Sequence, residues 1–191
     1  MSEIIDDGTY VSGTEHADAS VWPTATTWGL ISGAAGLVMA LLQYSFGGWD
    51  VDPATGQPAS GALWTLLSTV VTIALIYLGL KAYRDTANGG VLTLGRGVLW
   101  SLAFGVVSGL VGAVLLYVFF AFIAPDITAQ MALAQENVLE EQGLSGDDLE
   151  TAMSMASMFT SPLSLALFSA IGSVIFSVII GLIVSLFVKT R

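Results

Sequence analysis

Apolar residues gather in four long blocks of this chain, and polar residues lie in the stretches between the blocks. At about 1.5 Å per residue, a helix of about 20 apolar residues crosses a hydrocarbon core of roughly 30 Å. The blocks therefore predict four transmembrane helices, at about residues 27–46, 62–80, 97–124 and 162–188. We expect an all-α, polytopic integral membrane protein whose membrane domain spans residues 23–191.

Small residues recur at every fourth position in the third and fourth blocks. The third block carries Gly97, Ser101, Gly105, Gly109 and Ala113, and the fourth carries Ser169, Ser173, Ser177, Gly181 and Ser185. Small residues at this spacing let two helix backbones approach closely in lipid. We expect the third and fourth spans to pack as a tight antiparallel pair. The alternative is that the serines hydrogen-bond carbonyl groups of their own helix.

The stretch between the third and fourth spans, residues 126–160, is polar, acidic and rich in helix-forming residues. Apolar residues recur at helical spacing in both of its halves: Ile127, Met131, Ala134 and Val138, then Leu149, Ala152, Ala156 and Phe159. Gly143 marks the end of the first half, and Ser145 with the acids after it marks the start of the second. This pattern predicts a helical hairpin inserted between the two spans.

Two further stretches have no sustained periodicity. Residues 47–61 contain glycine pairs, prolines and aspartates, which predict a loop. Residues 1–22 contain five acids and no Lys or Arg, and we expect a solvated, disordered cytoplasmic tail. Because no basic segment directly precedes the first apolar block, we expect a retained anchor rather than a signal peptide. His16 lies in the tail and is expected to be solvated.

The basic residues predict the orientation of the chain. They lie between the second and third spans or at the C-terminus: Lys81, Arg84, Arg96, Lys189 and Arg191. With four spans these places share one side of the membrane, so the positive-inside rule makes both termini cytoplasmic and the insert extracytoplasmic. Arg96 is expected to extend from the end of the third span to the lipid phosphates, and the alternative is a functional anion site.

Composition excludes several classes of protein. Hydrophobic residues make up 54% of the chain and charged residues 10%, against about 25% charged in a soluble domain. A net charge of −10 argues against a nucleic-acid partner, and the absence of cysteine excludes disulfides and thiolate chemistry. The span interiors hold no Asp, Glu, Lys or His that could serve as a coupling site of an ion-coupled carrier. No phosphate-binding, zinc or serine-nucleophile motif occurs, so we expect neither an enzyme nor a cofactor.

Two groups of residues in the insert could bind metal. Thioether sulfur suits Cu(I), and on one helix Met155 and Met158 are the methionines that could share an ion. The ordinary alternative is that these methionines pack between helices. The insert also carries five clustered acids, whose spacing fits no calcium loop and which we expect to form a solvated surface: Glu140, Glu141, Asp147, Asp148 and Glu150.

Several short segments share an order and spacing with a known family. They are RDTANGG (84–90), LTLGRG (92–97), PD (125–126), EEQGLSGDDLE (140–150) and MFTSP (158–162). Over about residues 24–190 the chain resembles an uncharacterised bacterial four-span membrane family, the domain of unknown function four-one-nine-nine. Members often have a more basic approach to the third span, where this chain has only Arg96. The resemblance implies four helices in a bacterial inner membrane, and it brings no activity or catalytic residues.

These observations predict a function without chemistry. We expect a non-enzymatic membrane scaffold or accessory subunit, embedded in the lipid bilayer, whose insert at residues 126–160 contacts a protein partner. The alternative is a small passive channel or transporter for an unidentified solute. That alternative requires a continuous polar path among the spans, or a pore formed by several copies of the chain.

Overall fold

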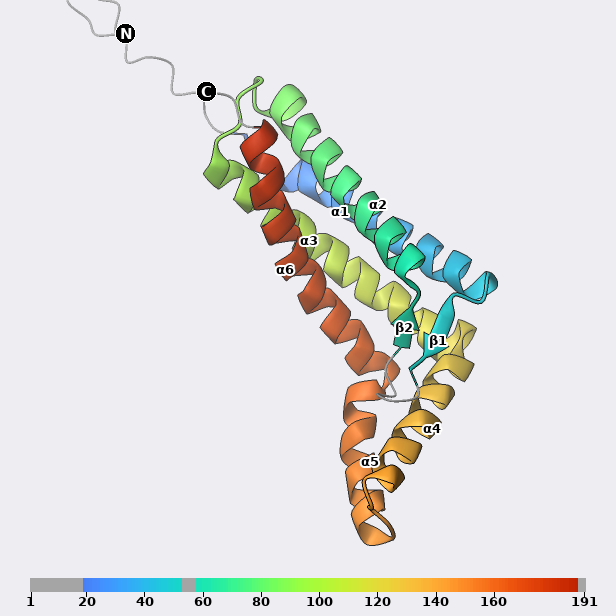
Figure 1. The fold of residues 1–191 in the computed structure, drawn as a ribbon. Helices are drawn as coiled ribbons and strands as arrows, with labels where there is room; N and C mark the ends of the chain where they lie inside the picture. The colour runs from blue at the N-terminus through green and yellow to red at the C-terminus, as the bar shows by residue number, and fades with distance from the viewer. Residues whose placement is uncertain (1–18, 53–57, 189–191) are drawn as a thin grey trace, which may run out of the picture.

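A computed structural model describes residues 19–52 and 58–188 of the chain (Figure 1). Within them, four helical stretches are long and apolar enough to cross a membrane: Trp22–Ser45, Ala62–Ala87, Leu94–Ile123 and Pro162–Val188. The first is α1 (Trp22–Ser45), and the fourth is α6 (Pro162–Val188). The second joins α2 (Ala62–Ala82) to a π-helical turn, η1 (Tyr83–Ala87), and the third joins α3 (Leu94–Val118) to another, η2 (Phe119–Ile123).

Two spans begin earlier than the sequence predicts. α1 starts at Trp22 rather than at residue 27, and Pro23 lies in its first turn, where the missing N–H costs no helical hydrogen bond. α3 starts at Leu94 rather than at residue 97, because the Thr93 side chain caps it by accepting a hydrogen bond from the Arg96 N–H. Hydropathy marks the apolar part of a span, whereas caps decide where the helix begins.

The predicted loop at residues 47–61 contains a small antiparallel sheet, so the fold is not purely helical. β1 (Trp49–Val51) pairs with β2 (Pro58–Ser60), with Trp49 opposite Ser60. The Trp49 ring packs 5.9 Å from Phe119 and 5.5 Å from Phe120 between ring centroids, and its Nε1 donates to the Ala40 carbonyl at 3.3 Å. Strands of three residues are too short to show an alternation of apolar and polar residues in the sequence. The contacts of Trp49 are tertiary, so no local pattern predicts them.

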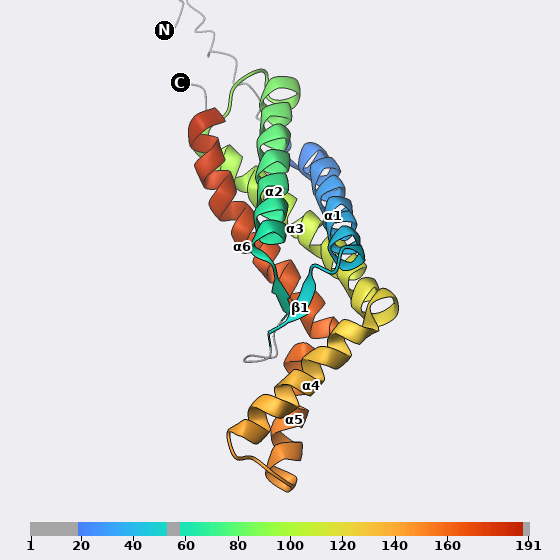
Figure 2. The ribbon, with the colours of Figure 1, turned by 45° about the vertical axis from the view of Figure 1, so that its right-hand side comes forward.

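α3 is the central helix of the bundle. It packs along much of its length against α6 on one side and α1 on the other, and α2 lies beside them (Figure 2). α2 buries Ile76, Gly79 and Leu80 near its end, whereas Leu63 and Leu66 near its start are 72% and 63% exposed. Exposed apolar side chains on a spanning helix are expected to face lipid.

Two clusters of buried side chains stabilise opposite ends of the bundle. One lies at the end that holds Ala19 and Val188, here called the terminal end, and includes Ile76, Leu80, Tyr83, Trp100 and Phe104. The other lies at the opposite, distal end and includes Ala40, Phe119, Phe120, Ile127 and Met131. The clusters bring residues from all the spans together, because α3 contributes to both and its neighbours pack around it.

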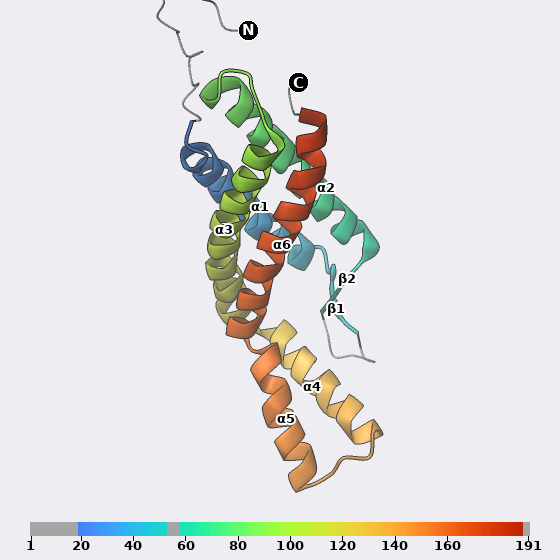
Figure 3. The ribbon, with the colours of Figure 1, turned by 90° about the vertical axis from the view of Figure 1, so that its left-hand side faces the viewer.

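Two further helices, α4 (Pro125–Glu141) and α5 (Asp147–Thr160), lie between η2 and α6 at the distal end (Figure 3). They contact each other and extend away from the spans. Gly143 and Gly146 adopt positive φ angles of 88° and 59° in the turn between them, which favours glycine. The N-cap of α5 is Gly146 rather than the predicted Ser145, and no side chain caps this helix.

Candidate functional site

The interface between α3 and α6 pairs glycine with serine. Gly97 lies against Ser185 and Gly105 against Ser177, and a Cβ added to Gly97 would lie 2.1 Å from the Ser185 Oγ. In between, the order reverses: a Cβ added to Gly181 would lie 1.8 Å from the Ser101 Oγ. Each serine therefore fills the space that a glycine leaves on the opposite helix, and the two backbones approach closely, as small residues allow in lipid.

The four-residue repeat loses this register toward the distal end. Gly109 lies against the Ala170 backbone, and a Cβ there would come 2.8 Å from the Ala170 carbonyl oxygen. Ser173 contacts Ser108 instead, at 3.1 Å between the two hydroxyl oxygens. Ala113 is half-buried, and Ser169 is exposed. A helix turns about 100° per residue, so each four-residue step rotates the repeat by about 40° away from the contact line.

The alternative role predicted for the serines occurs at Ser101 of α3, whereas the Ser185 Oγ of α6 has no hydrogen-bond partner within the described residues. The Ser101 Oγ donates to the Gly97 carbonyl at 2.8 Å while Ser101 contacts Gly181 across the interface. Ser108 likewise donates to the carbonyl of Gly105, at 3.3 Å. Hydrogen bonding within the helix and packing between helices are thus compatible, because a bond to a carbonyl three or four residues earlier holds the hydroxyl close to its own backbone.

α1 uses the same kind of contact with α3, which the sequence analysis did not predict. Cβ atoms added to Gly29 and Gly33 would lie 2.8 Å and 2.6 Å from atoms of Val107 and Val111. The two glycines are four residues apart, so the signal was present in the sequence. It was missed because the partner residues on α3 are valines rather than a second stripe of small residues.

A cavity of about 350 Å³, here called the central cavity, lies among α1, α3 and α6, with Thr72 of α2 at its border. Glycines of all three helices line it: Gly36, Gly112 and Gly172. A Cβ added to any of these three would meet no atom within 4 Å, in contrast to the glycines of the helix interfaces. The bundle therefore leaves a space that ordinary side chains could fill without a clash.

Polar side chains line the central cavity and its neighbour. A distal cavity of about 220 Å³ shares Ser32, Gly36 and Thr72 with the central cavity and reaches Gln43. The Gln43 side chain is 9% exposed, and its Nε2 donates to the Gly48 carbonyl at 2.7 Å. Within the described residues, the polar side chains of both linings carry hydroxyl, amide or indole groups, and no ionisable side chain lines either cavity. The arrangement can hydrogen-bond a neutral group.

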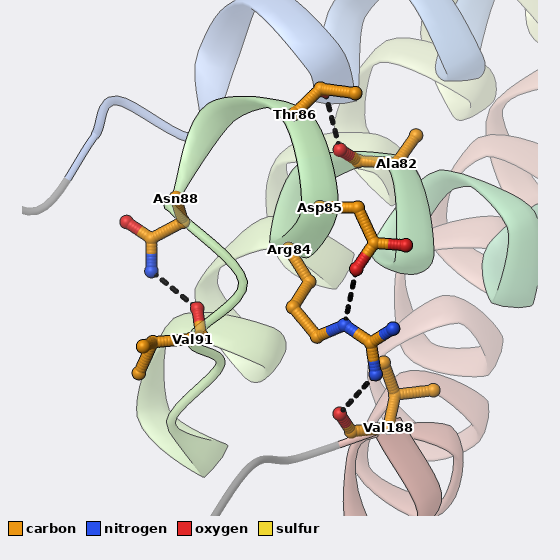
Figure 4. A network of polar contacts seen from close by, with 7 residues as sticks. All are labelled: Ala82, Arg84, Asp85, Thr86, Asn88, Val91 and Val188. Carbon is orange, nitrogen blue, oxygen red and sulfur yellow. Dashed lines mark hydrogen bonds and ion pairs between the residues drawn. The ribbon is translucent and has the colours of Figure 1, made fainter.

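At the terminal end, side chains of η1 and of Asn88 contact both ends of the described chain, and Figure 4 shows the contact of Arg84 with Val188. Arg84 forms an ion pair with Asp85 at 2.6 Å, and its Nη1 donates to the Val188 carbonyl of α6 at 3.1 Å. The Tyr83 hydroxyl donates to the Ala19 carbonyl at 2.7 Å, and Asn88 accepts from the Ala19 N–H at 3.1 Å. These contacts hold the start of α1 and the end of α6 against the connection between α2 and α3.

The structure gathers the predicted basic residues at this same end. Arg96 is half-buried, and its Nη1 reaches the Ala19 carbonyl at 3.5 Å. Lys81 is exposed near Arg84. Lys189 and Arg191 lie outside the described residues, as do His16 and most of the predicted tail. Arg96 thus extends toward Ala19 at the terminal end of the bundle.

The two candidate methionines of α5, Met155 and Met158, do not pack between helices. On α5, Met155 is 59% and Met158 is 70% exposed, and Met153 is half-buried. Packing was the expected role of Met155 and Met158, and it is wrong because α4 covers a different face of α5. The five acids are also exposed. Within residues 19–52 and 58–188, no three His, Cys, Asp or Glu side chains are grouped to hold a metal.

Comparison with known proteins agrees with the resemblance found in the sequence. No curated protein and no solved structure matches this chain. Residues 27–190 match a family described as "Protein of unknown function (DUF4199)". This match covers all four spans of the structure, except for the first residues of α1, and both helices between α3 and α6. The chain therefore belongs to that family of proteins of unknown function.

Proposed function

We propose that this protein is a non-enzymatic scaffold or accessory subunit of a bacterial cytoplasmic membrane. Its terminal end faces the cytoplasm, and α4 and α5 form an extracytoplasmic helical hairpin that contacts a membrane-protein partner. The observation that carries the proposal is an exposed apolar surface that continues past the distal end of α6 onto α5. The orientation is supported by Lys81, Arg84 and Arg96 at the terminal end.

The apolar surface runs along one side of α6 and α5. Its exposed side chains are Met155, Met158, Phe159, Leu163 and Phe168. The Phe159 and Phe168 rings stack at 6.3 Å between centroids, which joins the two helices into one surface. α6 has 27 residues and is about 40 Å long, more than the roughly 30 Å hydrocarbon core. The part of this surface on α5 therefore extends beyond the region that lipid tails cover, which favours a protein partner.

The base of α4 is held firmly, which supports a role in presenting a surface. Ile127 and Met131 are 3% and 0% exposed and pack in the cluster with Phe119 and Phe120. Asp126 accepts a hydrogen bond from the Tyr44 hydroxyl at 3.0 Å. The buried contacts at the base of α4 fix the orientation of this helix, and of α5 packed on it, relative to the spans. The side chains farther along the two helices remain exposed.

A passive channel is the second candidate, and the hydroxyl-lined cavities favour it. A path through one copy would have to continue from the central cavity to the terminal end. There, Trp100, Phe104, Ile76 and Leu80 are each 0% exposed and fill the space between the helices. The Trp100 Nε1 is also bound to the Thr24 hydroxyl at 3.0 Å. This packing favours the scaffold over a single-chain pore, since conduction would require the cluster to open.

Site-specific photocrosslinking tests the scaffold. A photoreactive amino acid at position 155 or 158 is expected to yield a defined protein adduct in intact cells, and the same residue at position 186 is not. Leu186 is a matched control, because it is an exposed apolar residue (53%) on α6 near the terminal end. The adduct is expected to disappear when Phe159 and Phe168 are both replaced by serine. Equal adducts at all three positions, or none at any of them, would contradict the proposal.

A flux measurement tests the second candidate. The purified protein in liposomes is expected to give no solute leakage above that of empty liposomes, because the terminal cluster is closed. Selective leakage that increases in Trp100→Ala would instead establish the channel, since this change removes the largest side chain of the closed region.

A further inference from the structure

We propose that the central cavity binds an uncharged amphiphile that enters from the bilayer and hydrogen-bonds through a hydroxyl or carbonyl group. The ligand class follows from three features of the site: its opening, its lining and its unfilled volume. This binding site is independent of the partner surface on α5, because the two lie on different parts of the molecule.

The cavity opens at the level of the hydrocarbon core. Gly36 of α1 and Ser169 and Gly172 of α6 line it and are exposed on the outside of the bundle. Gly36 and Gly172 lie well inside their helices, roughly 13 to 24 Å from either helix end at 1.5 Å per residue. A molecule that reaches this opening therefore comes from among the lipid chains, which requires an apolar portion.

The lining selects a neutral polar group. A full charge would be costly at this depth, and no ionisable side chain among the described lining residues would compensate it. Ser177 is 1% exposed and lines the cavity, so its hydroxyl is a polar group that a bound ligand can reach. A ligand that hydrogen-bonds this hydroxyl gains affinity over one that has no polar group. Ser32 supplies a second hydroxyl, from α1, at the same cavity.

The volume is suited to a ligand rather than to closer packing. About 350 Å³ lies within the range of small-molecule sites. Gly36, Gly112 and Gly172 come from three helices, and each leaves open space where a Cβ would lie. The same helices pack tightly at Gly33, Gly105 and Gly109, so the open space is local and not a general looseness of the bundle.

Photolabelling of the full-length protein in phosphatidylcholine vesicles tests the site. The probe is a monoacylglycerol with a diazirine in its acyl chain, which is uncharged and carries hydroxyl and ester groups. Intact-protein mass spectrometry measures the labelled fraction, and peptide mapping locates the label. We expect labelling of cavity residues that unlabelled monoacylglycerol prevents, and that hexadecane or an anionic fatty acid prevents far less.

Substitutions that fill the cavity provide the decisive comparison. Gly112→Leu and Gly172→Leu are expected to lower cavity labelling at least about tenfold, because the leucine and the probe cannot occupy the same close-packed space. Gly95→Leu is the matched control, because Gly95 is also a helical glycine with no atom within 4 Å of an added Cβ, but it does not line the cavity. Its labelling is expected to equal that of the parent protein.

Removal of the hydroxyl tests the polar contact separately. Ser177→Ala shortens a side chain without filling the cavity, and it is expected to reduce labelling by about two- to tenfold, as the loss of one hydrogen bond would. The melting temperature of each variant is measured in detergent, and labelling is compared only among variants that melt like the parent protein. Gly36→Leu replaces any leucine variant that melts lower. Undiminished labelling in the cavity-filling variants would overturn the site. Equal competition by hexadecane, with no effect of Ser177→Ala, would overturn the neutral polar ligand.

Discussion

Gly105 and Gly109 lie where the backbones of α3 and α6 come closest. An added Cβ would meet the Val174 Cα at 3.0 Å from the first and the Ala170 carbonyl oxygen at 2.8 Å from the second. Backbone atoms cannot rotate away as the end of a side chain can, so a larger residue must separate the helices. Without a hydrophobic driving force between helices in lipid, such van der Waals contacts are a main source of association.

Gly105→Leu and Gly109→Leu are therefore expected to destabilise the fold by about 1–3 kcal/mol each, the usual cost of overpacking. Gly95→Leu, which adds the same side chain to the same helix in open space, is expected to leave stability unchanged or slightly raised. Denaturation followed by circular dichroism in detergent measures the difference. If the three variants unfold together, α3 and α6 are not held by this contact.

Arg84 makes its contact at the end of a helix rather than between the faces of two helices. Its Nη1 donates to the Val188 carbonyl, one of the groups that the end of α6 leaves without a helical partner. Arg84→Gln is expected to speed amide hydrogen exchange in the last turn of α6 and to leave residues 97–109 of α3 unaffected. Lys81→Gln removes an exposed charge of the same sign nearby and serves as the control. Identical exchange in the two variants would show that Arg84 does not cap α6.

At the scale of elements, α4 differs from the spans because its packing changes along its length. Ile127 and Met131 are buried against η2 and the β-sheet region, whereas Leu133 is 61% exposed. The helix is attached at its first turns, where the π-helical η2 ends at Ala124 and Pro125 begins the next helix. Attachment at one end and exposure at the other suit an element that presents a surface.

Met131→Ala is expected to destabilise the attachment of α4 by about 2–5 kcal/mol, since it creates a cavity in the distal cluster. Leu133→Ala removes a similar apolar volume two residues away and is expected to change stability by no more than about 0.5 kcal/mol, because that side chain is exposed. Limited proteolysis between α4 and α6 measures the attachment, with faster cleavage expected for Met131→Ala alone. Equal cleavage rates of the two variants would show that Met131 does not hold α4 to the distal cluster.

The elements also show what sequence patterns can predict here. Long apolar blocks predicted the four spans, because the bilayer demands both length and low charge. Gly97 and Ser185 could be assigned to packing faces from their spacing, and the structure brings them together. The contact of Trp49 with Phe119 could not be predicted, since it joins residues far apart in the chain. The central cavity could not be predicted either, because spacing does not reveal which of Gly33 and Gly36 faces a neighbour and which faces open space.

The whole molecule combines a tightly packed membrane core with a projecting pair of helices. α1, α3 and α6 form the core through small residues, and the start and end of the described chain meet at its terminal end. α4 and α5 lie at the opposite end (Figure 1). The proposed function places α4 and α5 on the other side of the membrane from Lys81, Arg84 and Arg96, and this placement is its central claim.

Single-cysteine labelling tests that claim most directly, because the natural chain has no cysteine. Exposed positions are available at Asp50 in β1, Gln142 at the end of α4 and Thr86 in η1. An impermeant maleimide is expected to label Asp50→Cys and Gln142→Cys in intact cells, and to label Thr86→Cys only after the membrane is permeabilised. Labelling of Thr86→Cys in intact cells, with protection of the other two, would contradict the account.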